Sequence, residues 1–290
     1  MGTDKRERQK ANRQLRLEEM AKAQQQQRFK RRGLLIGGGI AAAILLAFLF
    51  SLFGSDDDGG EAQSTTTLAA TADATDTTVP VSAAPAATVP PAATVPGIAI
   101  TGETPCPPED GSAERTITFE QPPPMCIDET KSYTAEIETN VGAMTVELDA
   151  TKAPNTVNNF VVLARYHYFD GIVCHRAIPG FMVQCGDPEG TGSGGPGYEF
   201  DDELPDAGEY VIGSLAMANA GANTNGSQFF IITGDQGVAL DPDYSLFGQV
   251  TEGLDTTVTA LDALGNPDPD ANGVPPLGLI QISGVTITES

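Results

Sequence analysis

The stretch "IVCHRAIPGFMVQC", from Ile172 to Cys185, places two apolar runs on either side of Pro179 and Gly180. Short runs of this kind around turn-forming residues are typical of a β-hairpin. If the turn has two residues, Cys174 faces Cys185 directly across the two strands. The stretch therefore predicts a hairpin, and the segments around it follow the same pattern.

Alternating apolar and polar residues predict further strands along the chain after residue 130. "YTAEIET" and "AMTVELD" flank the turn "NVG" and are typical of a second hairpin. Four more segments have the composition of strands: "EYVIGSLAMA", "SQFFIIT", "SLFGQV" and "LIQISGVTIT". Together with the four strands of the two hairpins, these segments make eight short strands.

Two helices are expected between these strands. Thr151 is placed to cap the first helix, and Pro154 lies in its first turn. One face of this helix is apolar and consists of Val157, Phe160, Val161 and Ala164. The second helix fits residues 253–263. Within residues 131–290, eight strands and two helices predict a closed antiparallel β-barrel whose ends are capped by the helices.

The N-terminal part differs sharply in charge from the rest. Residues 1–32 hold eleven of the 16 Lys and Arg residues but four of the 39 Asp and Glu residues, so the remainder carries a net charge of −30. Residues 33–54 lack charge, and as a helix about 33 Å long they could cross a bilayer core. The basic block predicts a cytoplasmic N-terminus and a single transmembrane helix. The alternative is a cleaved signal peptide, which the long basic region disfavours.

The segment after the predicted anchor is poor in large apolar residues. Residues 55–105 consist mainly of Ala, Thr, Pro, Asp and Ser, a composition that predicts a disordered linker. Residues 106–130 form a lead-in in which Cys106 and Cys126 bracket a proline-rich stretch. Because disulfides persist outside the cytoplasm, we expect the pairs Cys106–Cys126 and Cys174–Cys185. Four reduced thiols are the alternative.

Several classes of function are disfavoured by the residues. The acidic balance of the chain after its basic start would repel nucleic acid. A Cys–His hydrolase site is not expected, because Cys174 and His175 point to opposite faces of one strand. "DPDANG" at residues 268–273 begins like a calcium loop, but its twelfth position is Leu279. "GTGSGGPG" lacks the Lys of a phosphate-binding loop, and we expect a flexible loop.

One group of residues combines a cation, amides and apolar side chains: Arg176, Phe181, Met182, Gln184, Asn219, Gln228 and Phe230. Asn and Gln side chains can pair with the backbone of an extended peptide. Phe and Met can line an apolar pocket for a proline ring, and a fixed guanidinium can donate to a developing lone pair. This set suits rotation about an X–Pro peptide bond, a reaction in which no covalent bond is made or broken.

The segments "CHRAIPGFMVQCGDPEGTG", "MANAGANTNGSQFFIIT" and "SLFGQVTEGLD" resemble, in this order, sequence blocks of the cyclophilins, which are peptidyl-prolyl cis-trans isomerases. The likeness runs from about residue 133 to residue 288. With its predicted anchor and the lead-in "PPMCID", the chain is similar to the membrane-anchored, extracytoplasmic cyclophilins of Gram-positive bacteria, actinobacteria especially.

The resemblance implies a site. Arg176 would be the catalytic residue, and Gln184 would hold the substrate carbonyl and brace Arg176. The other implied substrate-binding residues are Phe181, Met182, Ala218, Asn219, Ala220, Gln228, Phe230, Leu240 and Tyr244. Two positions depart from the family pattern. Ala239 stands where many members have Trp, which should weaken cyclosporin binding, and Tyr244 stands where many have His.

The implied site and the expected disulfide require different registers of the first hairpin. If Arg176 lies directly opposite Gln184, then Cys174 is one residue away from facing Cys185 directly. A bulge or a three-residue turn would accommodate both pairs. Without either, we give preference to the pairing of the site residues.

We therefore expect an isomerase of X–Pro bonds that assists the folding of secreted or envelope proteins from the outer side of the cell membrane. The reaction requires no cofactor, and we expect no metal site. We expect a monomer whose partners are proline-containing segments and not nucleic acids. The main alternative is a membrane-tethered module that binds proline peptides without catalysis. An inert domain on a structural anchor is a third possibility.

Overall fold

The computed structural model describes residues 96–290. Its main sheet has eight antiparallel strands in the order β10-β3-β4-β9-β7-β8-β6-β5. In chain order the strands are β3 (Tyr133–Thr139), β4 (Gly142–Leu148), β5 (Arg176–Ile178), β6 (Met182–Cys185), β7 (Ser214–Met217), β8 (Phe229–Ile232), β9 (Leu246–Glu252) and β10 (Ile282–Glu289). Each strand lies within or overlaps a segment that the sequence pattern predicted as a strand.

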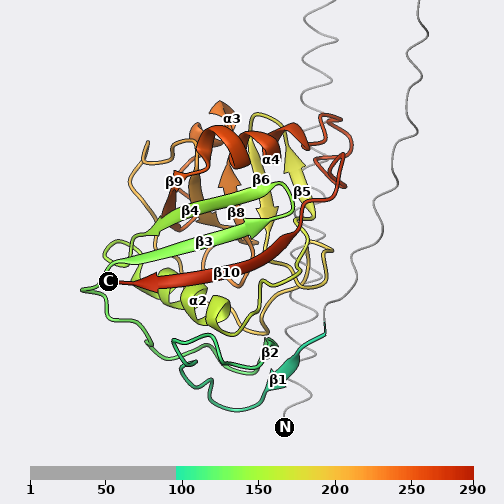
Figure 1. The fold of residues 1–290 in the computed structure, drawn as a ribbon. Coiled ribbons are helices and arrows are strands. Elements are labelled where there is room, and N and C mark those ends of the chain that lie inside the picture. The colour runs from blue at the N-terminus through green and yellow to red at the C-terminus, as the bar shows by residue number, and fades with distance from the viewer. Residues whose placement is uncertain (1–95) are drawn as a thin grey trace, which may run out of the picture. The chain divides into compact units, whose positions relative to one another are not determined.

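Helices lie at opposite ends of the curved sheet (Figure 1). The helix α2 (Pro154–Arg165) packs near β10, and α3 (Asp235–Val238) lies toward the other end together with η1 (Leu254–Val258) and α4 (Thr259–Ala263). The predicted second helix is confirmed, as one π-helical segment, η1, that continues into α4. The short helix α3 was not predicted.

The first helix begins differently from the prediction. Its N-cap residue is Ala153, and Thr151 makes no capping hydrogen bond to it. Instead, the Glu203 carboxylate accepts hydrogen bonds from the backbone N–H groups of Asn155 at 3.0 Å and Thr156 at 2.8 Å. A carboxylate at this end satisfies unpaired N–H groups and interacts favourably with the helix dipole. The prediction that Thr151 caps the helix is therefore wrong. The acceptor comes from Glu203, which is distant in sequence, and a local sequence pattern does not reveal such a partner.

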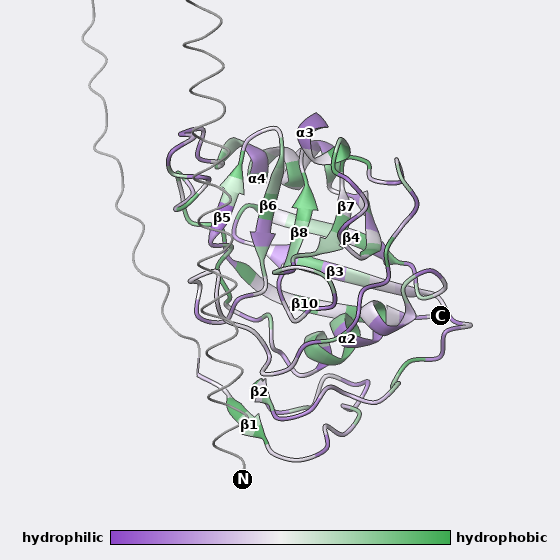
Figure 2. Ribbon diagram, turned by 180° about the vertical axis from the view of Figure 1, so that it is seen from behind, coloured by the Kyte–Doolittle hydropathy of each residue, from purple (hydrophilic) through white to green (hydrophobic). Residues whose placement is uncertain are grey.

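The two faces of the central strands pack into two separate apolar clusters. On one face, Phe229 of β8 and Phe247 of β9 pack against Phe160 of α2, with ring centroids 5.6 and 5.3 Å apart. All four residues of β8 are buried, and Figure 2 colours this strand as strongly hydrophobic. Because side chains alternate between the faces of a strand, Phe230 lies on the opposite face, in a smaller cluster with Met182. The main core therefore lies on the face of the sheet that packs against α2. The smaller cluster lies on the opposite face, which is the face that carries the candidate site.

The predicted closed barrel is wrong, because the sheet is open between its edge strands β5 and β10. The segments next to these edges are joined by an isolated bridge, Val173 to Gln281, and by backbone hydrogen bonds between residues 171–174 and 280–282. The backbone N–H and carbonyl groups of Ala177 in β5 form hydrogen bonds with a loop instead of with β10. Its N–H donates to Gly273 O, and its carbonyl accepts from Asn266 N, at 3.0 and 2.9 Å. The loop formed by residues 266–273 thus takes the place that a closing strand would need.

The lead-in packs on the domain as an ordered segment. Two short parallel strands, β1 (Ile98–Ile100) and β2 (Thr116–Phe119), form a small sheet, and the Cys106–Cys126 disulfide closes the segment that follows β1. The strand β1 lies within the range that composition assigned to the linker. The Phe119 ring packs on Tyr166 and Tyr198, with centroids 5.4 and 6.2 Å away. The lead-in is therefore part of the folded domain.

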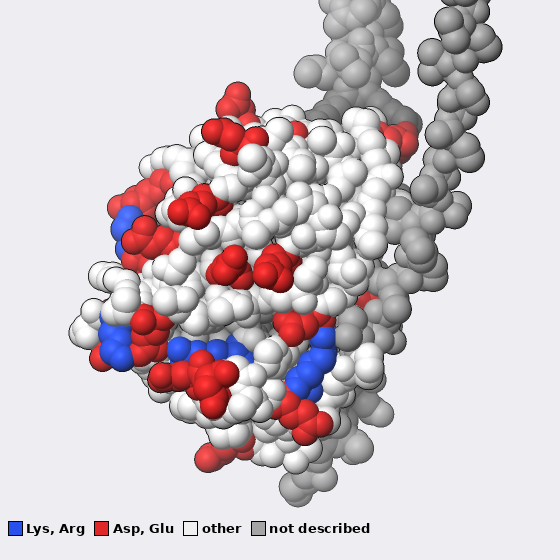
Figure 3. Space-filling model, in the orientation of Figure 1, with Lys and Arg blue, Asp and Glu red and all other residues white. Residues whose placement is uncertain are grey.

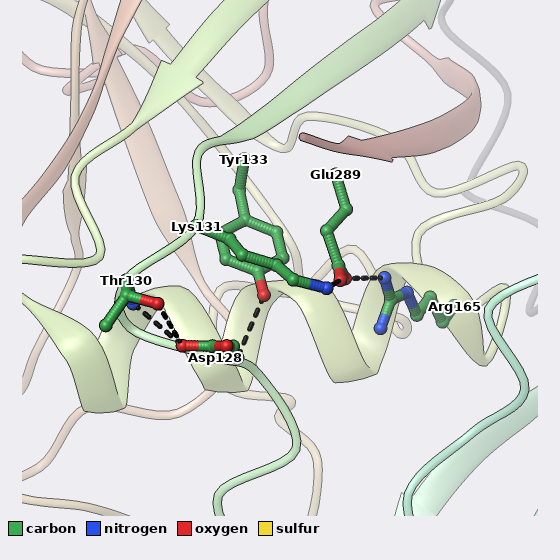
Figure 4. A network of polar contacts seen from close by, with 6 residues as sticks. All are labelled: Asp128, Thr130, Lys131, Tyr133, Arg165 and Glu289. Atoms are coloured by element: carbon green, nitrogen blue, oxygen red, sulfur yellow. Dashed lines mark hydrogen bonds and ion pairs between the residues drawn. The ribbon is translucent and has the colours of Figure 1, made fainter.

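A polar network fastens the end of the chain to α2 (Figure 4). Glu289 of β10 forms ion pairs with Lys131 and with Arg165, the latter at 3.0 Å. The Asp128 backbone N–H donates to the Tyr133 hydroxyl at 2.9 Å, which fixes the entry into β3. The Arg165 side chain is 6% exposed, so Glu289 supplies a charge partner to a buried cation. This contact ties the last strand to the helix beneath the sheet.

The predicted cytoplasmic segment 1–32 and transmembrane helix 33–54 lie outside the described residues, as does most of the predicted linker 55–105. Among residues 96–290, no helix is long and apolar enough to cross a membrane.

Candidate active site

A single row of paired residues crosses five strands and carries the candidate site. Arg176 of β5 pairs with Gln184 of β6, Gln184 with Phe230 of β8, Phe230 with Ala216 of β7, and Ala216 with Leu246 of β9. Directly paired residues on neighbouring strands point to the same face of a sheet. The register therefore places the guanidinium, an amide and an aromatic ring side by side.

The Arg176 guanidinium is held by neutral acceptors on two sides. Its Nη1 donates to Gln184 Oε1 at 3.3 Å, while Nε donates to the backbone oxygen and Nη2 to the side-chain oxygen of Asn272, each at 3.0 Å. Burial lowers the pKa of Arg176, and the nearby Tyr244 phenol opposes this effect. Because arginine is not deprotonated in proteins, the group stays charged at neutral pH.

Asn272 was not predicted as a site residue. The sequence analysis placed it in a loop that begins like a calcium site, and the partner it meets is 96 positions away in the chain. Asn272 lies at φ 52°, and Gly273 follows at φ 79°. An Asn-Gly pair is a known signal for left-handed backbone, which was available in the sequence, but it says nothing about the partner of the side chain.

A relay of amides continues from Arg176 to a backbone carbonyl. Gln184 Nε2 donates to Gln228 Oε1 at 2.9 Å, and Gln228 Nε2 donates to Gly194 O at 2.9 Å. The bracing of Arg176 by Gln184 agrees with the sequence-based expectation. Gln228 was expected to shape the substrate groove, and the structure places it beside Gln184 as the next member of the relay.

The smaller apolar cluster lies on the same face as this row. It contains six of the residues expected to bind the substrate: Phe181, Met182, Ala218, Phe230, Leu240 and Tyr244. Phe230 and Tyr244 meet edge to face, with centroids 5.2 Å apart. Tyr210 and Ile178 also belong to the cluster and were not predicted. The Tyr210 hydroxyl donates to Tyr244 O at 2.6 Å, which secures the segment that carries the Tyr244 ring.

Two of the expected residues lie beside this cluster. Asn219 Nδ2 donates to Asp243 O at 2.9 Å, and its side-chain oxygen accepts from Gly221 N at 3.2 Å. The exposed Ala220 donates its backbone N–H to the Thr224 hydroxyl at 2.8 Å. The Asn219 side chain therefore joins two loops, and a substrate backbone would have to compete with these bonds.

The structure accommodates both the expected register and the expected disulfide of the hairpin. The β5–β6 turn has three residues, 179–181, because Ile178 pairs with Met182, so the two-residue turn is wrong. Arg176 still faces Gln184, while the Cys174–Cys185 disulfide forms just beyond the ladder. The turn is fixed by the Asp262 carboxylate, which accepts from Gly180 N at 2.7 Å.

Arg176 is one of two cations among residues 96–290 that form no ion pair; the other, Arg115, donates to the backbone oxygens of Asp170 and Tyr168. Lys131 and Arg165 pair with Glu289, and Lys152 pairs with Glu209. Figure 3 shows the blue basic side chains of one face next to red acidic ones. Within residues 96–290, Arg176 forms no ion pair and is held only by amide and carbonyl oxygens. Its positive charge is therefore not neutralised by a bound carboxylate.

Comparison with known proteins identifies the family. Residues 134–285 match the family model described as "Cyclophilin type peptidyl-prolyl cis-trans isomerase/CLD". The chain belongs to the cyclophilin family. This membership supports peptidyl-prolyl cis-trans isomerase activity, as the sequence predicted. The match covers the main sheet from the second residue of β3 to Val285 in β10. It does not include the lead-in.

Proteins of several organisms are similar to this chain. The chain is 43% identical over 155 residues to "Peptidyl-prolyl cis-trans isomerase-like 3" of Gallus gallus, which covers 52% of this chain and 93% of the relative. The Homo sapiens protein of the same name is 42% identical over the same shares. A crystal structure of a Cryptosporidium parvum cyclophilin-type isomerase aligns with a TM-score of 0.49 at 33% identity, covering 55% of this chain and 99% of that one.

Proposed function

We propose that this cyclophilin catalyses rotation about X–Pro bonds with Arg176 as its catalytic residue and the smaller apolar cluster as its prolyl pocket. The main support is the cross-strand row, in which Arg176, Gln184 and Phe230 are directly paired neighbours on one face. A proline ring seated against Phe230 and Met182 would bring its amide nitrogen toward the guanidinium.

The chemistry of the bond explains why a fixed cation is useful. Rotation about a peptide bond is opposed by its partial double-bond character, with a barrier of about 20 kcal/mol. In the planar ground state the prolyl nitrogen has no free lone pair. At the twisted midpoint the lone pair localises and can accept a hydrogen bond. A donor that interacts only at this point lowers the barrier without tightening substrate binding.

The guanidinium has donors left for this purpose. Of its five N–H groups, three are used by Gln184 and Asn272, and the other two have no hydrogen-bond partner within the described part of the chain. Gln184 and Asn272 fix the direction of the group before the substrate arrives. An acceleration of about 10⁴ requires about 5.5 kcal/mol, which a charge-assisted hydrogen bond and correct orientation of the ring could together supply.

The clients that we propose are secreted or envelope proteins that fold in an oxidising compartment. Support comes from the two disulfides, Cys106–Cys126 and Cys174–Cys185, with no free cysteine in the domain. Disulfides of this kind are rare in the cytosol, where thiols are kept reduced. The proposal also agrees with the resemblance to extracytoplasmic cyclophilins of Gram-positive bacteria.

A proline-peptide isomerisation assay on the full chain tests the catalytic assignment. We expect Arg176→Ala to lower kcat/KM by about 100-fold, equivalent to about 2.7 kcal/mol of transition-state stabilisation. Lys152→Ala is the control, because Lys152 pairs with Glu209 outside the site row, and it should stay within about twofold of the wild type. A wild-type rate no higher than the uncatalysed rate would instead favour a peptide-binding module.

A further inference from the structure

Asp187 is a fully buried carboxylate at the start of the loop that follows β6. Its side chain accepts hydrogen bonds from six donors of this loop. They are Glu189 N at 2.8 Å, Thr191 N at 2.9 Å, the Thr191 hydroxyl at 3.1 Å, Gly192 N at 2.6 Å, Ser193 N at 3.1 Å and Gly194 N at 3.1 Å. A buried charge is costly unless it is paired in this way, so the loop and the carboxylate stabilise each other.

The glycine-rich loop is thus organised around a side chain of the protein itself. Five of its backbone N–H groups point at Asp187, which leaves them unavailable to an external phosphate. The approach is closest at Gly194, where an added Cβ atom would lie 1.9 Å from Asp187 Oδ1. A residue with a side chain at position 194 would push the loop away from the carboxylate.

Gly194 links this loop to Arg176. Its carbonyl oxygen accepts from Gln228, Gln228 accepts from Gln184, and Gln184 accepts from Arg176. The two ends of this relay allow one direction only, because a backbone carbonyl can only accept and a guanidinium can only donate. The Gly194 carbonyl and the guanidinium therefore favour the same orientation of both amides, in which the Gln184 oxygen is directed at the guanidinium.

We propose that Asp187 is a positioning residue for isomerisation. It holds Gly194 in place, and Gly194 orients Gln228, Gln184 and finally Arg176. The inference rests on the proposed catalytic role of Arg176. Asp187 is separated from Arg176 by the whole relay, so its loss should lower kcat through the orientation of the guanidinium and change KM little.

Two single variants and their combination in the full chain test this relay. We expect Asp187→Asn to lower kcat about tenfold with KM within about twofold, because in either orientation of the amide its NH2 group faces at least one backbone donor that the carboxylate had satisfied. Gln228→Ala should lower kcat by a similar factor. In the Gln228→Ala background, Asp187→Asn should have almost no further effect, since residues that act through one another are not additive.

Asp149→Asn is the matched control. The Asp149 carboxylate also accepts two backbone N–H groups, from Thr151 and Lys152, but it has no connection to Arg176. This variant should keep kcat within about twofold of the wild type. If Asp187→Asn does not fold, Thr191→Ala replaces it, because it removes the hydroxyl donor to Asp187. A decrease in kcat of about threefold is then expected, again absent in the Gln228→Ala background.

The outcomes separate this inference from the catalytic assignment. A folded Asp187→Asn variant with wild-type kcat, or an effect that adds fully to that of Gln228→Ala, would overturn the positioning role even if Arg176→Ala shows its expected loss of activity. Wild-type activity of Arg176→Ala would overturn the catalytic assignment itself. The expected combination is a lower kcat in Asp187→Asn, no additivity with Gln228→Ala, and a larger loss of activity in Arg176→Ala.

Discussion

Asn272 holds Arg176 through two acceptors, its backbone carbonyl and its side-chain oxygen. With Gln184 on the other side, the guanidinium is restrained in its plane and cannot rotate without losing a hydrogen bond. Both braces are neutral, so they orient the charge without cancelling it. A carboxylate at either place would hold the group more strongly but would reduce its attraction for a developing lone pair.

The side chain of Asn272 should therefore contribute to the rate. Asn272→Gly keeps a residue that tolerates the left-handed backbone at φ 52° but removes the side-chain oxygen. We expect kcat to fall about fivefold, the equivalent of about 1 kcal/mol for one hydrogen bond. Asp270→Asn in the same exposed loop serves as the control and should change kcat little. A folded Asn272→Gly variant as fast as the wild type would exclude this role.

Residues of the site differ in how far they could be predicted. Arg176, Gln184 and Phe230 lie on strands, so a family motif together with strand register is enough to place them side by side. Asn272 and Asp187 act from loops. Their partners depend on how each loop folds back, which neither hydrophobic periodicity nor local turn chemistry determines.

At the scale of elements, the hairpin β5–β6 determines the geometry of the site. Its three-residue turn sets Arg176 opposite Gln184, and the Cys174–Cys185 disulfide fastens the two chains just beyond the ladder. The strands themselves were predictable from their composition. The open sheet was not predictable from the sequence. The loop 266–273 forms hydrogen bonds with the backbone N–H and carbonyl of Ala177, and backbone hydrogen bonds of this kind have no sequence signature.

Removing each disulfide by paired Cys→Ala substitutions should separate stability from activity. The Cys174–Cys185 and Cys106–Cys126 disulfides close loops of 11 and 20 residues, and each should stabilise the folded state by about 3 kcal/mol. Both variants should therefore unfold at a lower denaturant concentration than the wild type. Only the loss of Cys174–Cys185 should also lower kcat, because this disulfide is two residues from Arg176 and adjoins Gln184. Equal kcat values for the two folded variants would show that the hairpin holds its register without the crosslink.

At the scale of the whole molecule, Glu289 joins the last strand to α2 and to the entry of the sheet. Hydrogen bonds from Lys131 and Arg165 lower the pKa of Glu289. Burial alone would raise the pKa of Asp187, but its backbone hydrogen bonds outweigh this effect and lower it. Both carboxyls therefore bind protons more readily in the unfolded chain, and their stabilising contribution is complete above the ordinary carboxyl pKa of about 4.

The domain should lose stability as the pH falls below about 4 and these two carboxyls become protonated. Glu289→Gln should reduce the free energy of unfolding by about 1–3 kcal/mol at pH 7, because the buried Arg165 loses a charged partner. The variant should also show a smaller decrease between pH 7 and pH 3, measured by denaturant unfolding. An acid dependence as steep as that of the wild type would show that Glu289 does not contribute to it.

Exchange of a proline peptide between its cis and trans forms, followed by NMR on the saturated protein, tests the role of Arg176 most directly. Saturation removes affinity from the comparison, so the rate reports the bond rotation alone. We expect Arg176→Ala to bind the peptide within a few-fold of the wild type and to slow the exchange by about 100-fold. Exchange at the wild-type rate in the bound Arg176→Ala variant would contradict the assignment of this guanidinium to the transition state.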